Sequence, residues 1–473
     1  MSGTPLLPPE LWDKIPSDCQ QALLALFAAH HAQLAQLRER VVDLERRLGQ
    51  NSSNSSKPPS SDGPHVKPAP PKIPSGKRQG GQPGHTRHER TRREPTHVLD
   101  VKPCSCGRCG SELTGDDLDP AWRQVVELPP VRPDVTEYRM HTLTCSHCGT
   151  STAAEAPPES AREYGPALQA SLSLLSVGYR LSKRSVQSLA SDLLGLEIST
   201  GQICALERET AKTLEPVVAE AHEYVKGQPA NVDETGWKQG KAKAWLWVAV
   251  TKLVTVFAIA LSRSRGAFED LIGPSYRWVV TSDRYSAYGG RPLGQRQVCW
   301  AHLQRDFQAM IDRGGVAKGI GEDLQALGVG LLKQWKRVRD GTQTREAFQA
   351  DTLSWLKGEV AQALRSGFAC DCAKTEGTCG ELLKVEEALW TFARVVGVEP
   401  TNNAAERALR HAVCWRKTSH GTDSACGSRF VERMLTVVGS CRQQGRSVLA
   451  FLTECVRAER NGSARPSLLP VTP

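Results

Sequence analysis

The chain has 473 residues, enough for several folding units of roughly 150 residues each and for a sizeable buried core. Lys and Arg number 60 against 51 Asp and Glu, and the formal net charge of +9 favours a polyanionic partner. The fifteen cysteines are too sparse for a disulfide scaffold, and no secretory signal is expected, which favours a reducing cytosol. Lys252 divides the most apolar stretch, residues 244–261, into pieces too short to span a bilayer as helices. Together these features exclude the collagen, mucin, membrane-channel and small secreted classes.

Residues 1–56 are expected to form an N-terminal helical segment. Apolar side chains recur at spacings of three and four, with Arg and Glu between them. They are Phe27, Leu34, Leu37, Val41, Leu44 and Leu48. This short heptad pattern predicts a coiled coil that joins at least two copies of the chain. His30 weakens the heptad, so an amphipathic helix packed on its own chain is the alternative.

Residues 57–98 are expected to form a flexible basic arm. They are rich in Pro, Gly and Lys and lack the apolar surface that offsets the entropy of folding. Between Lys57 and Pro95, nine Lys or Arg residues stand against three acidic ones. A mobile basic segment releases counterions when it lies along phosphates, which makes Lys77 and Arg78 candidate DNA contacts. A merely solvated charged segment is the alternative.

Two Cys-x-x-Cys motifs predict a zinc-binding module over residues 99–156. The first motif contains Cys106 and Cys109, and the second contains Cys145 and Cys148, with strand-like stretches between them. Four thiolates from two such turns fit the tetrahedral coordination of a structural Zn²⁺ ion. Cys104 or His147 can replace one of these ligands, and a redox dithiol is the weaker interpretation.

Residues 157–226 are expected to form a helical DNA-binding domain. The stretches SVQSLASDLLG and STGQICALERETAKTL have helical patterns, and Ser199 and Thr200 suit the N-cap of the second. Two helices joined in this way fit a helix-turn-helix. Many all-α domains that never bind DNA contain the same pair, and such a domain is the alternative.

Residues 227–440 carry the pattern of an α/β catalytic domain. The stretches PANVDETGW, KAWLWVAVT and LVTVFAIAL predict three successive strands, and a helix and a further strand follow, as at the start of a ribonuclease-H-like sheet. Asp233 lies near the end of the first strand and Asp283 at the end of the fourth. Two carboxylates on adjacent strand ends can share divalent metal ions. A lone Asp at a strand end is more often a cap, and only the pairing argues otherwise.

Glu406 is the candidate third carboxylate. It lies in the first turns of a helix predicted from PTNNAAERALR, which Thr401 or Asn402 would cap. Spacing alone does not single it out, because several other acidic residues lie between Asp283 and Glu406.

The order of these motifs resembles the DDE transposases of the insertion-sequence-66 type, specifically their TnpC-like large subunit. The similarity covers nearly the whole chain and depends on seven features in order. These are NSSNSSKPPSSD after the coiled coil, QGGQPGHT, the Cys-x-x-Cys pair, VDETGW, SDRYSAYG, CWAHLQRDF and TNNAAERALR. The resemblance implies a ribonuclease-H-like core in which Asp233, Asp283 and Glu406 form the catalytic triad. It also implies a helical insertion at about 307–398.

By this resemblance the triad binds Mg²⁺, for which Mn²⁺ can substitute. Water then cleaves the phosphodiester at an element end, and the freed 3′-hydroxyl attacks target DNA. His302 of CWAHLQRDF is a fourth candidate catalytic residue that orients phosphate or water, with simple packing as the alternative. Further candidate DNA contacts are donors near the triad. They are Arg305, Asn402, Asn403, Arg407 and Arg410.

The sequence thus predicts a multidomain α/β protein: a ribonuclease-H-like core with a helical insertion, preceded by a coiled coil, a four-cysteine zinc module and a helix-turn-helix-like domain. Residues 441–473 are expected to form a C-terminal helix and a disordered tail. Cys370, Cys372 and Cys379 form a cluster that suggests a second zinc ion but lacks a fourth ligand.

The expected function is that of an active transposase in the bacterial cytoplasm, associated with the nucleoid. Its partners would be double-stranded DNA, both terminal inverted repeats and target, further copies of the chain, and any small accessory transposition proteins, with no membrane. A catalytically silent DNA-binding protein and a simple ribonuclease-H-like nuclease are the alternatives.

Overall fold

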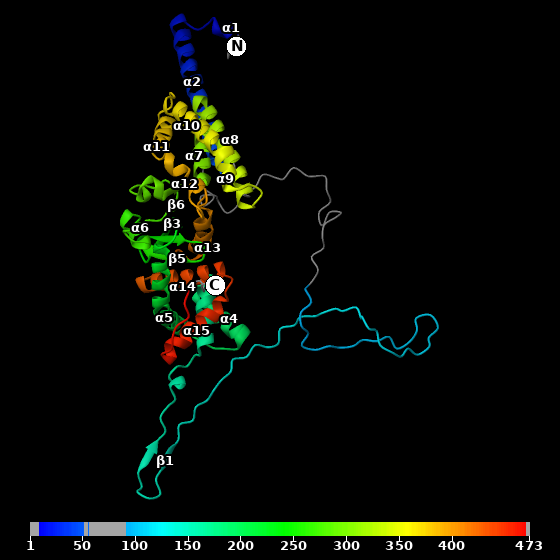
Figure 1. The fold of residues 1–473 in the computed structure, drawn as a ribbon. Coiled ribbons are helices and arrows are strands. Elements are labelled where there is room, and N and C mark those ends of the chain that lie inside the picture. The colour runs from blue at the N-terminus through cyan, green and yellow to red at the C-terminus, as the bar shows by residue number, and fades with distance from the viewer. Residues whose placement is uncertain (1–8, 52–54, 56–90, 470–473) are drawn as a thin grey trace. The chain divides into compact units, whose positions relative to one another are not determined.

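The computed structural model describes residues 9–51, 55 and 91–469 (Figure 1). Lys77, Arg78 and most of the predicted basic arm lie outside these residues. The chain divides into two compact units. One comprises Met1–Pro70, Val218–Ser428 and Leu468–Pro473, and the other comprises Pro71–Val217 and Arg429–Ser467. None of the helices within the described ranges is both long enough and apolar enough to cross a membrane.

The first unit contains a five-stranded sheet with the order β5-β4-β3-β6-β7. β3 and β4 are antiparallel, as are β4 and β5, whereas β6 and β7 run parallel to β3. The strands are β3 (Ala230–Gln239), β4 (Ala242–Val250), β5 (Thr255–Ala260), β6 (Val280–Ser282) and β7 (Arg296–Val298). Between β5 and β6 lies α6 (Arg265–Ile272). The predicted strands and helix are therefore confirmed, in the predicted order.

Helical structure separates β7 from Glu406, as expected for residues 307–398. The α-helices are α7 (Trp300–Arg313), α8 (Gly315–Arg339), α9 (Arg345–Phe348), α10 (Ser354–Phe368), α11 (Ala373–Lys384) and α12 (Thr391–Arg394), followed by α13 (Asn403–Ser419). A π-helical turn, η5 (Gln349–Leu353), joins α9 to α10. Short 3₁₀ turns are η3 (Ser286–Tyr288), η4 (Leu293–Gln295) and η6 (Glu386–Leu389).

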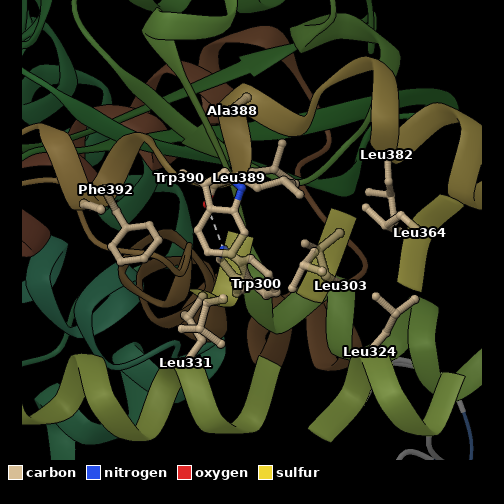
Figure 2. Packing of buried hydrophobic residues seen from close by; sticks show 14 of the residues in the cluster. Trp300, Leu303, Leu324, Leu331, Leu364, Leu382, Ala388, Leu389, Trp390 and Phe392 are labelled. Atoms are coloured by element: carbon tan, nitrogen blue, oxygen red, sulfur yellow. Dashed lines mark hydrogen bonds between the residues drawn. The ribbon is translucent and has the colours of Figure 1, made fainter. Parts of the chain in front are cut away.

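These helices have their own aromatic and leucine core (Figure 2). Trp300 and Trp390 are buried with ring centroids 5.2 Å apart. The indole Nε1–H of Trp300 donates to the Leu389 carbonyl at 2.8 Å, so this aromatic side chain is anchored at both its apolar and its polar end. Since Trp300 opens α7 directly after β7, this core fixes the position of the helix that carries His302 and Arg305.

The N-terminal part of the first unit contains α1 (Pro9–Trp12) and α2 (Ser17–Leu48). The single helix α2 includes the heptad residues, and several of its apolar side chains are exposed. They include Leu34, Leu37, Val41, Leu44 and Leu48.

The second unit is mainly helical. Its helices are α3 (Pro166–Gly178), α4 (Lys183–Leu194), the first part of α5 (Thr200–Lys226), α14 (Ala425–Gln443, from Arg429) and α15 (Val448–Asn461), with a 3₁₀ turn η2 (Pro158–Ala161). Ser182 caps α4 by accepting from the Ser185 N–H. The two helices predicted for the helix-turn-helix region are therefore present as α4 and α5.

The C-terminal part differs from the expected disordered tail. The helix α15 continues to Asn461, Arg446 Nη1 donates to the Ser467 carbonyl at 2.9 Å, and Leu468 is fully buried. An apolar side chain and a backbone hydrogen bond hold a segment whose composition alone suggested disorder. The expectation of disorder after about residue 458 is therefore wrong up to Leu469, and the last four residues lie outside the described part. The helix α14 also runs through position 440, where the sequence suggested a boundary.

The zinc-binding region contains less strand than expected. Its one strand pair is β1 (Thr142–Thr144) with β2 (Ser151–Ala153), which form an antiparallel hairpin around the second Cys-x-x-Cys motif. WRQVVELP, residues 122–129, is extended without a strand partner in the described part of the chain. Its apolar side chains are exposed, including Val125 and Leu128, so no packing surface holds a strand there.

Candidate active site

Asp233 and Asp283 occupy matching positions on neighbouring parallel strands. Ala230 pairs with Val280 and Asn231 with Thr281 along β3 and β6. Each aspartate follows two residues after the second pair, and Asp283 comes directly after the last residue of β6. The strand pairing that the sequence predicted thus brings the two carboxylates side by side.

Local hydrogen bonds orient both aspartates. Asp233 Oδ1 accepts from the Glu234 N–H at 2.9 Å, and Asp283 Oδ1 accepts from the Tyr285 N–H at 2.9 Å. Each carboxylate therefore has one oxygen fixed by the backbone next to it. The second oxygen of each is engaged in no hydrogen bond found among the described residues.

Glu406 reaches the same region from α13. Its Oε1 atom lies 3.2 Å from Arg305 Nη2 and 3.4 Å from His302 Nδ1, and both partners lie on α7. The helix begins at Asn403, so Glu406 lies in its first turn, as predicted. Packing of α13 along β3 thus brings Glu406 close enough for its charge to act on Asp233. Among the described residues, the carboxylate oxygens of Asp233, Asp283 and Glu406 do not all lie within 4.8 Å of one another.

Asn402 stands at the N-cap position of α13 without capping it through its side chain. Its Nδ2 instead donates to the Val232 carbonyl at 2.9 Å, and its backbone N–H donates to Cys299 Sγ at 3.0 Å. Asn402 is completely buried. It therefore ties the start of α13 to β3 and to the end of β7, and its predicted role as a DNA contact is wrong because its donors point into the protein.

The electrostatics of the three carboxylates show that they share one environment. Burial, followed by the negative charges of Glu234, Asp283 and Glu406, raises the pKa of Asp233 well above its usual value. Such a group of oxygen ligands fits a hard divalent cation, which relieves the repulsion among them. His302 Nδ1 and Asn402 Oδ1 are also buried without a hydrogen-bond partner among the described residues. Unpaired polar atoms are uncommon in a protein interior, and here they adjoin the carboxylates.

Cys299, His302 and Glu406 place one possible ligand atom each within 4.8 Å of one another. Burial raises the pKa of the Cys299 thiol to about 11, so it stays protonated and accepts the Asn402 N–H. Burial, together with the Arg305 charge, lowers the pKa of His302. Cys299 Sγ already accepts the Asn402 N–H, so Cys299 acts here as part of the scaffold, and His302 faces Glu406.

A buried ion pair that the sequence did not suggest lies behind the aspartates. The Glu234 side chain is 1% exposed and accepts from Arg263 Nε at 2.7 Å and from the Tyr288 hydroxyl. Arg263 also lies over the Tyr285 ring, 3.7 Å from its centroid. The signal was present in VDETGW, where a second acidic residue directly follows Asp233 in a buried strand and therefore needs a partner.

The other predicted DNA contacts within the described residues lie on α7 and α13. Arg305 contacts Glu406, whereas Asn403, Arg407 and Arg410 are exposed on α13.

In the zinc region each Cys-x-x-Cys motif forms its own turn. The Gly110 N–H donates to the Cys106 carbonyl and the Gly149 N–H donates to the Cys145 carbonyl, both at 2.9 Å. In the part of the chain that the structure describes, the sulfur atoms of the two turns do not form a common cluster.

Comparison with known proteins decides the family. The model of the transposase IS66 family matches residues 164–429, which is more than half of the chain. The chain belongs to the IS66 transposase family. A second model, the zinc-finger binding domain of transposase IS66, matches residues 103–149, and a family of unknown function matches residues 7–91. The IS66 match contains all three carboxylates, and the zinc-finger match contains both Cys-x-x-Cys motifs.

Two curated relatives come from Sinorhizobium fredii. The uncharacterized protein y4hP is 24% identical over 405 residues, which cover 76% of this chain and 71% of y4hP. The uncharacterized protein y4qI is 24% identical over 237 residues, which cover 45% of this chain and 43% of y4qI. The first similarity extends well beyond the carboxylate-bearing unit of this IS66 family member.

Proposed function

We propose that this chain is a DNA transposase that binds the ends of an insertion sequence and catalyses metal-dependent strand cleavage and strand transfer. The observation that carries the proposal is that Asp233 and Asp283 lie at matching places on neighbouring strands and that the charge of Glu406 acts on Asp233, in a chain of the IS66 transposase family. The sheet order, with three antiparallel strands followed by two parallel ones, supports a ribonuclease-H-like core for this site.

In the proposed mechanism, Asp233, Asp283 and Glu406 hold two divalent cations, Mg²⁺ or Mn²⁺. When bound, the cations activate the attacking oxygen and neutralise charge that develops on the phosphate. The backbone N–H groups of Glu234 and Tyr285 keep the aspartates aimed at the site. Arg305 orients Glu406 and offers further N–H donors to the scissile phosphate, and His302 lies beside Glu406.

The zinc-finger region and the helices α4 and α5 are proposed to recognise the element ends. Hydrogen bonds with Ser111 lower the pKa of Cys109 to about 7, which favours the thiolate that zinc requires. We propose that one Zn²⁺ ion joins the two Cys-x-x-Cys turns through Cys106, Cys109, Cys145 and Cys148. Binding of one Zn²⁺ ion to both turns would order the extended segment that connects the two turns.

The exposed heptad residues of α2 support assembly of at least two copies of the chain. Leu37 and Leu44, one heptad apart, are 57% and 46% exposed. Apolar side chains at this spacing on one helix fit the seam of a coiled coil, where a second copy would cover them. Replacing both by Glu should convert the assembled protein to monomers in sedimentation velocity experiments.

The test uses the purified full chain with labelled element-end DNA and Mg²⁺, and it separates nicked from joined products. Asp283→Ala should abolish both products, whereas Asp270→Ala, the same change at an exposed position on α6, should leave both unchanged. Tight DNA binding without cleavage by the unmodified chain would favour a silent DNA-binding protein. Cleavage without joining would favour a simple nuclease.

A further inference from the structure

The sheet formed by β3, β4 and β5 has one face that α13 covers. Trp237 of β3 packs edge-on against Trp415 of α13 with ring centroids 6.0 Å apart, and its strand partner Ala244 is buried on the same face. Successive side chains of a strand point to opposite faces. Lys238 and Lys243, which follow Trp237 and precede Ala244, therefore lie on the face opposite α13.

This opposite face is covered at one end and open at the other. Trp247 is completely buried there, because Tyr288 of η3 packs edge-on against it with ring centroids 6.3 Å apart. Trp245 lies two residues earlier in β4, on the same face, and is only partly buried. Its partners in the neighbouring strands are Gly236 and Ala260, which are too small to cover an indole ring.

Two lysines stand beside Trp245 at the tip of the β3–β4 hairpin. Lys238 and Lys243 are exposed and pair directly with each other across the two strands. Lys243 Nζ lies 5.0 Å from the centroid of the Trp245 ring. Like charges placed opposite each other destabilise a strand pair, and neither lysine has an acidic partner among the described residues. An external polyanion would relieve this repulsion.

Arg263 carries positive charge to the other end of the same face. Its Nε donates to Glu234, and its guanidinium lies 3.7 Å from the centroid of the Tyr285 ring. Arg263 is partly exposed, and its charge interacts with that of Asp283. From Glu234 to Lys238 the strand β3 advances four residues, about 13 Å. The face therefore leads from the neighbourhood of Asp283 to the hairpin tip.

Cations beside a partly exposed aromatic ring suit an unpaired DNA strand. Lysine and arginine bind its phosphates, and the ring offers a stacking surface to any base. The bases of a duplex are stacked on one another and cannot use the ring. Lys243 has a flexible stem, so it can move from the ring to a phosphate and leave the ring to a base. A stacked strand of about 13 Å carries about four phosphates, at ~3.4 Å each.

We propose that Lys238, Lys243, Trp245 and Arg263 form a surface that binds the unpaired DNA strand next to the cleaved phosphodiester. The inference rests on the proposed function, because cleavage at Asp233 and Asp283 is what brings such a strand to this face. It assigns a binding role to the face of the sheet opposite α13, whereas the DNA contacts predicted from the sequence lie elsewhere.

The first experiment locates a bound strand by cross-linking. The full chain, without added Mg²⁺, is irradiated with a 12-residue single strand of mixed sequence in which 5-iodouracil replaces thymine, and cross-linked peptides are identified by mass spectrometry. The peptide that contains Trp245 should be cross-linked. An excess of the same strand without iodine should remove this cross-link, whereas a duplex of the same length and sequence should compete poorly.

The second experiment measures the affinity of the full chain for the single strand by fluorescence anisotropy. Trp245→Ala should weaken binding at least about 5-fold, the lower limit for stacking of one base on an aromatic ring, and Trp245→Phe should retain most of the affinity. The matched control is Trp355→Ala on α10, where the indole is 59% exposed but lies outside the surface. This control should bind as the unmodified chain does.

The lysines are tested by the salt dependence of the same binding. Lys238→Gln/Lys243→Gln should reduce the slope of log affinity against log salt by about 1.4, since each phosphate contact of a single strand contributes about 0.7. Lys333→Gln/Lys374→Gln, which changes two exposed lysines on α8 and α11, should keep the original slope. Circular dichroism and melting temperatures identify any variant that fails to fold, and the cross-link and the lysine pair then decide.

The outcomes separate this surface from the carboxylate site. Absence of the cross-link at Trp245, or equal affinity of Trp245→Ala and the unmodified chain, overturns the surface even if Asp283→Ala still abolishes cleavage. Equal competition by the duplex overturns the assignment to an unpaired strand. A cross-link at Trp245 together with a reduced salt slope supports the surface even in a chain that cleaves no DNA, because neither measurement requires catalysis.

Discussion

The backbone N–H of Asn402 donates a hydrogen bond to Cys299 Sγ at 3.0 Å across 103 positions of sequence. Cys299 follows β7 and Asn402 precedes α13, so this contact joins the strand edge to the helix that carries Glu406. The Cys299 N–H in turn donates to the Ser282 carbonyl at 2.9 Å, next to Asp283. The second and third carboxylates are therefore positioned by one short chain of hydrogen bonds.

Replacing Asn402 by Ala should destabilise the protein and displace Glu406. The change leaves the Val232 carbonyl without its side-chain donor in a buried site, and an unsatisfied buried group costs about 1–3 kcal/mol. Urea unfolding of Asn402→Ala and of the exposed neighbour variant Asn403→Ala measures the difference. Asn403→Ala should stay within about 0.5 kcal/mol of the unmodified chain. Equal effects of the two substitutions would show that the buried amide contributes nothing specific.

The sequence predicted the two aspartates from physical pattern alone, because strand ends and apolar runs are local signals. Glu406 needed the family resemblance, since a helix placed far along the chain returns to β3 only through tertiary packing. The sequence analysis predicted that Asn402 contacts DNA because its side-chain amide can donate hydrogen bonds. Only the structure shows that both of its donors are used internally.

Breaking the buried pair between Glu234 and Arg263 should be costly. Arg263→Met leaves the Glu234 carboxylate, 1% exposed, without its cation, and breaking such a pair costs about 3 kcal/mol. This is the low end for buried pairs, because the Arg263 side chain is 39% exposed and water can partly replace it. Urea unfolding measures the loss, and the same variant should lose strand transfer because β3 carries Asp233.

A double-mutant cycle isolates this pair. Glu234→Gln removes the buried charge, so Arg263→Met should cost much less in the Glu234→Gln background than in the unmodified chain. If the cost of Arg263→Met is the same in both backgrounds, the pair contributes no coupling energy, and packing of Arg263 on Tyr285 explains its effect.

The fold was predicted best where apolar runs are long and buried. Strands β4 and β5 follow directly from such runs, whereas WRQVVELP, which also contains β-forming residues, forms no strand. Its exposed side chains show that a strand needs a neighbour as well as a β-forming sequence. The prediction for the C-terminal tail erred in the opposite direction, since it expected disorder where the structure shows order. Composition does not reveal that one side chain, Leu468, is buried.

Zinc content should depend on the four cysteines of the two Cys-x-x-Cys turns. The unmodified chain should carry one equivalent of zinc by mass spectrometry, and Cys109→Ser or Cys148→Ser should remove most of it. Cys104→Ser and His147→Ala, which test the alternative ligands, should retain it. Two equivalents in the unmodified chain would instead indicate a second site, for which Cys370, Cys372 and Cys379 are the candidates.

Stability should fall in mildly acid solution because of His222 on α5. Burial lowers the pKa of His222 below the ordinary histidine value of 6.5, so the folded state holds this side chain neutral. Below pH 6.5 the unfolded chain binds a proton that the folded chain does not. Stability therefore rises with pH in this window, by at most about 1.4 kcal/mol per pH unit, and this contribution is complete above pH 6.5.

The variant His222→Gln cannot titrate and isolates this contribution. Because other groups titrate in both proteins, the informative quantity is the difference in unfolding free energy between variant and unmodified chain, measured in urea from pH 5 to pH 8. The difference should be constant above pH 6.5 and should shift in favour of His222→Gln as the pH falls. If the difference stays constant across the whole range, His222 has the same pKa in the folded and unfolded states. That result would contradict the prediction that burial lowers its pKa.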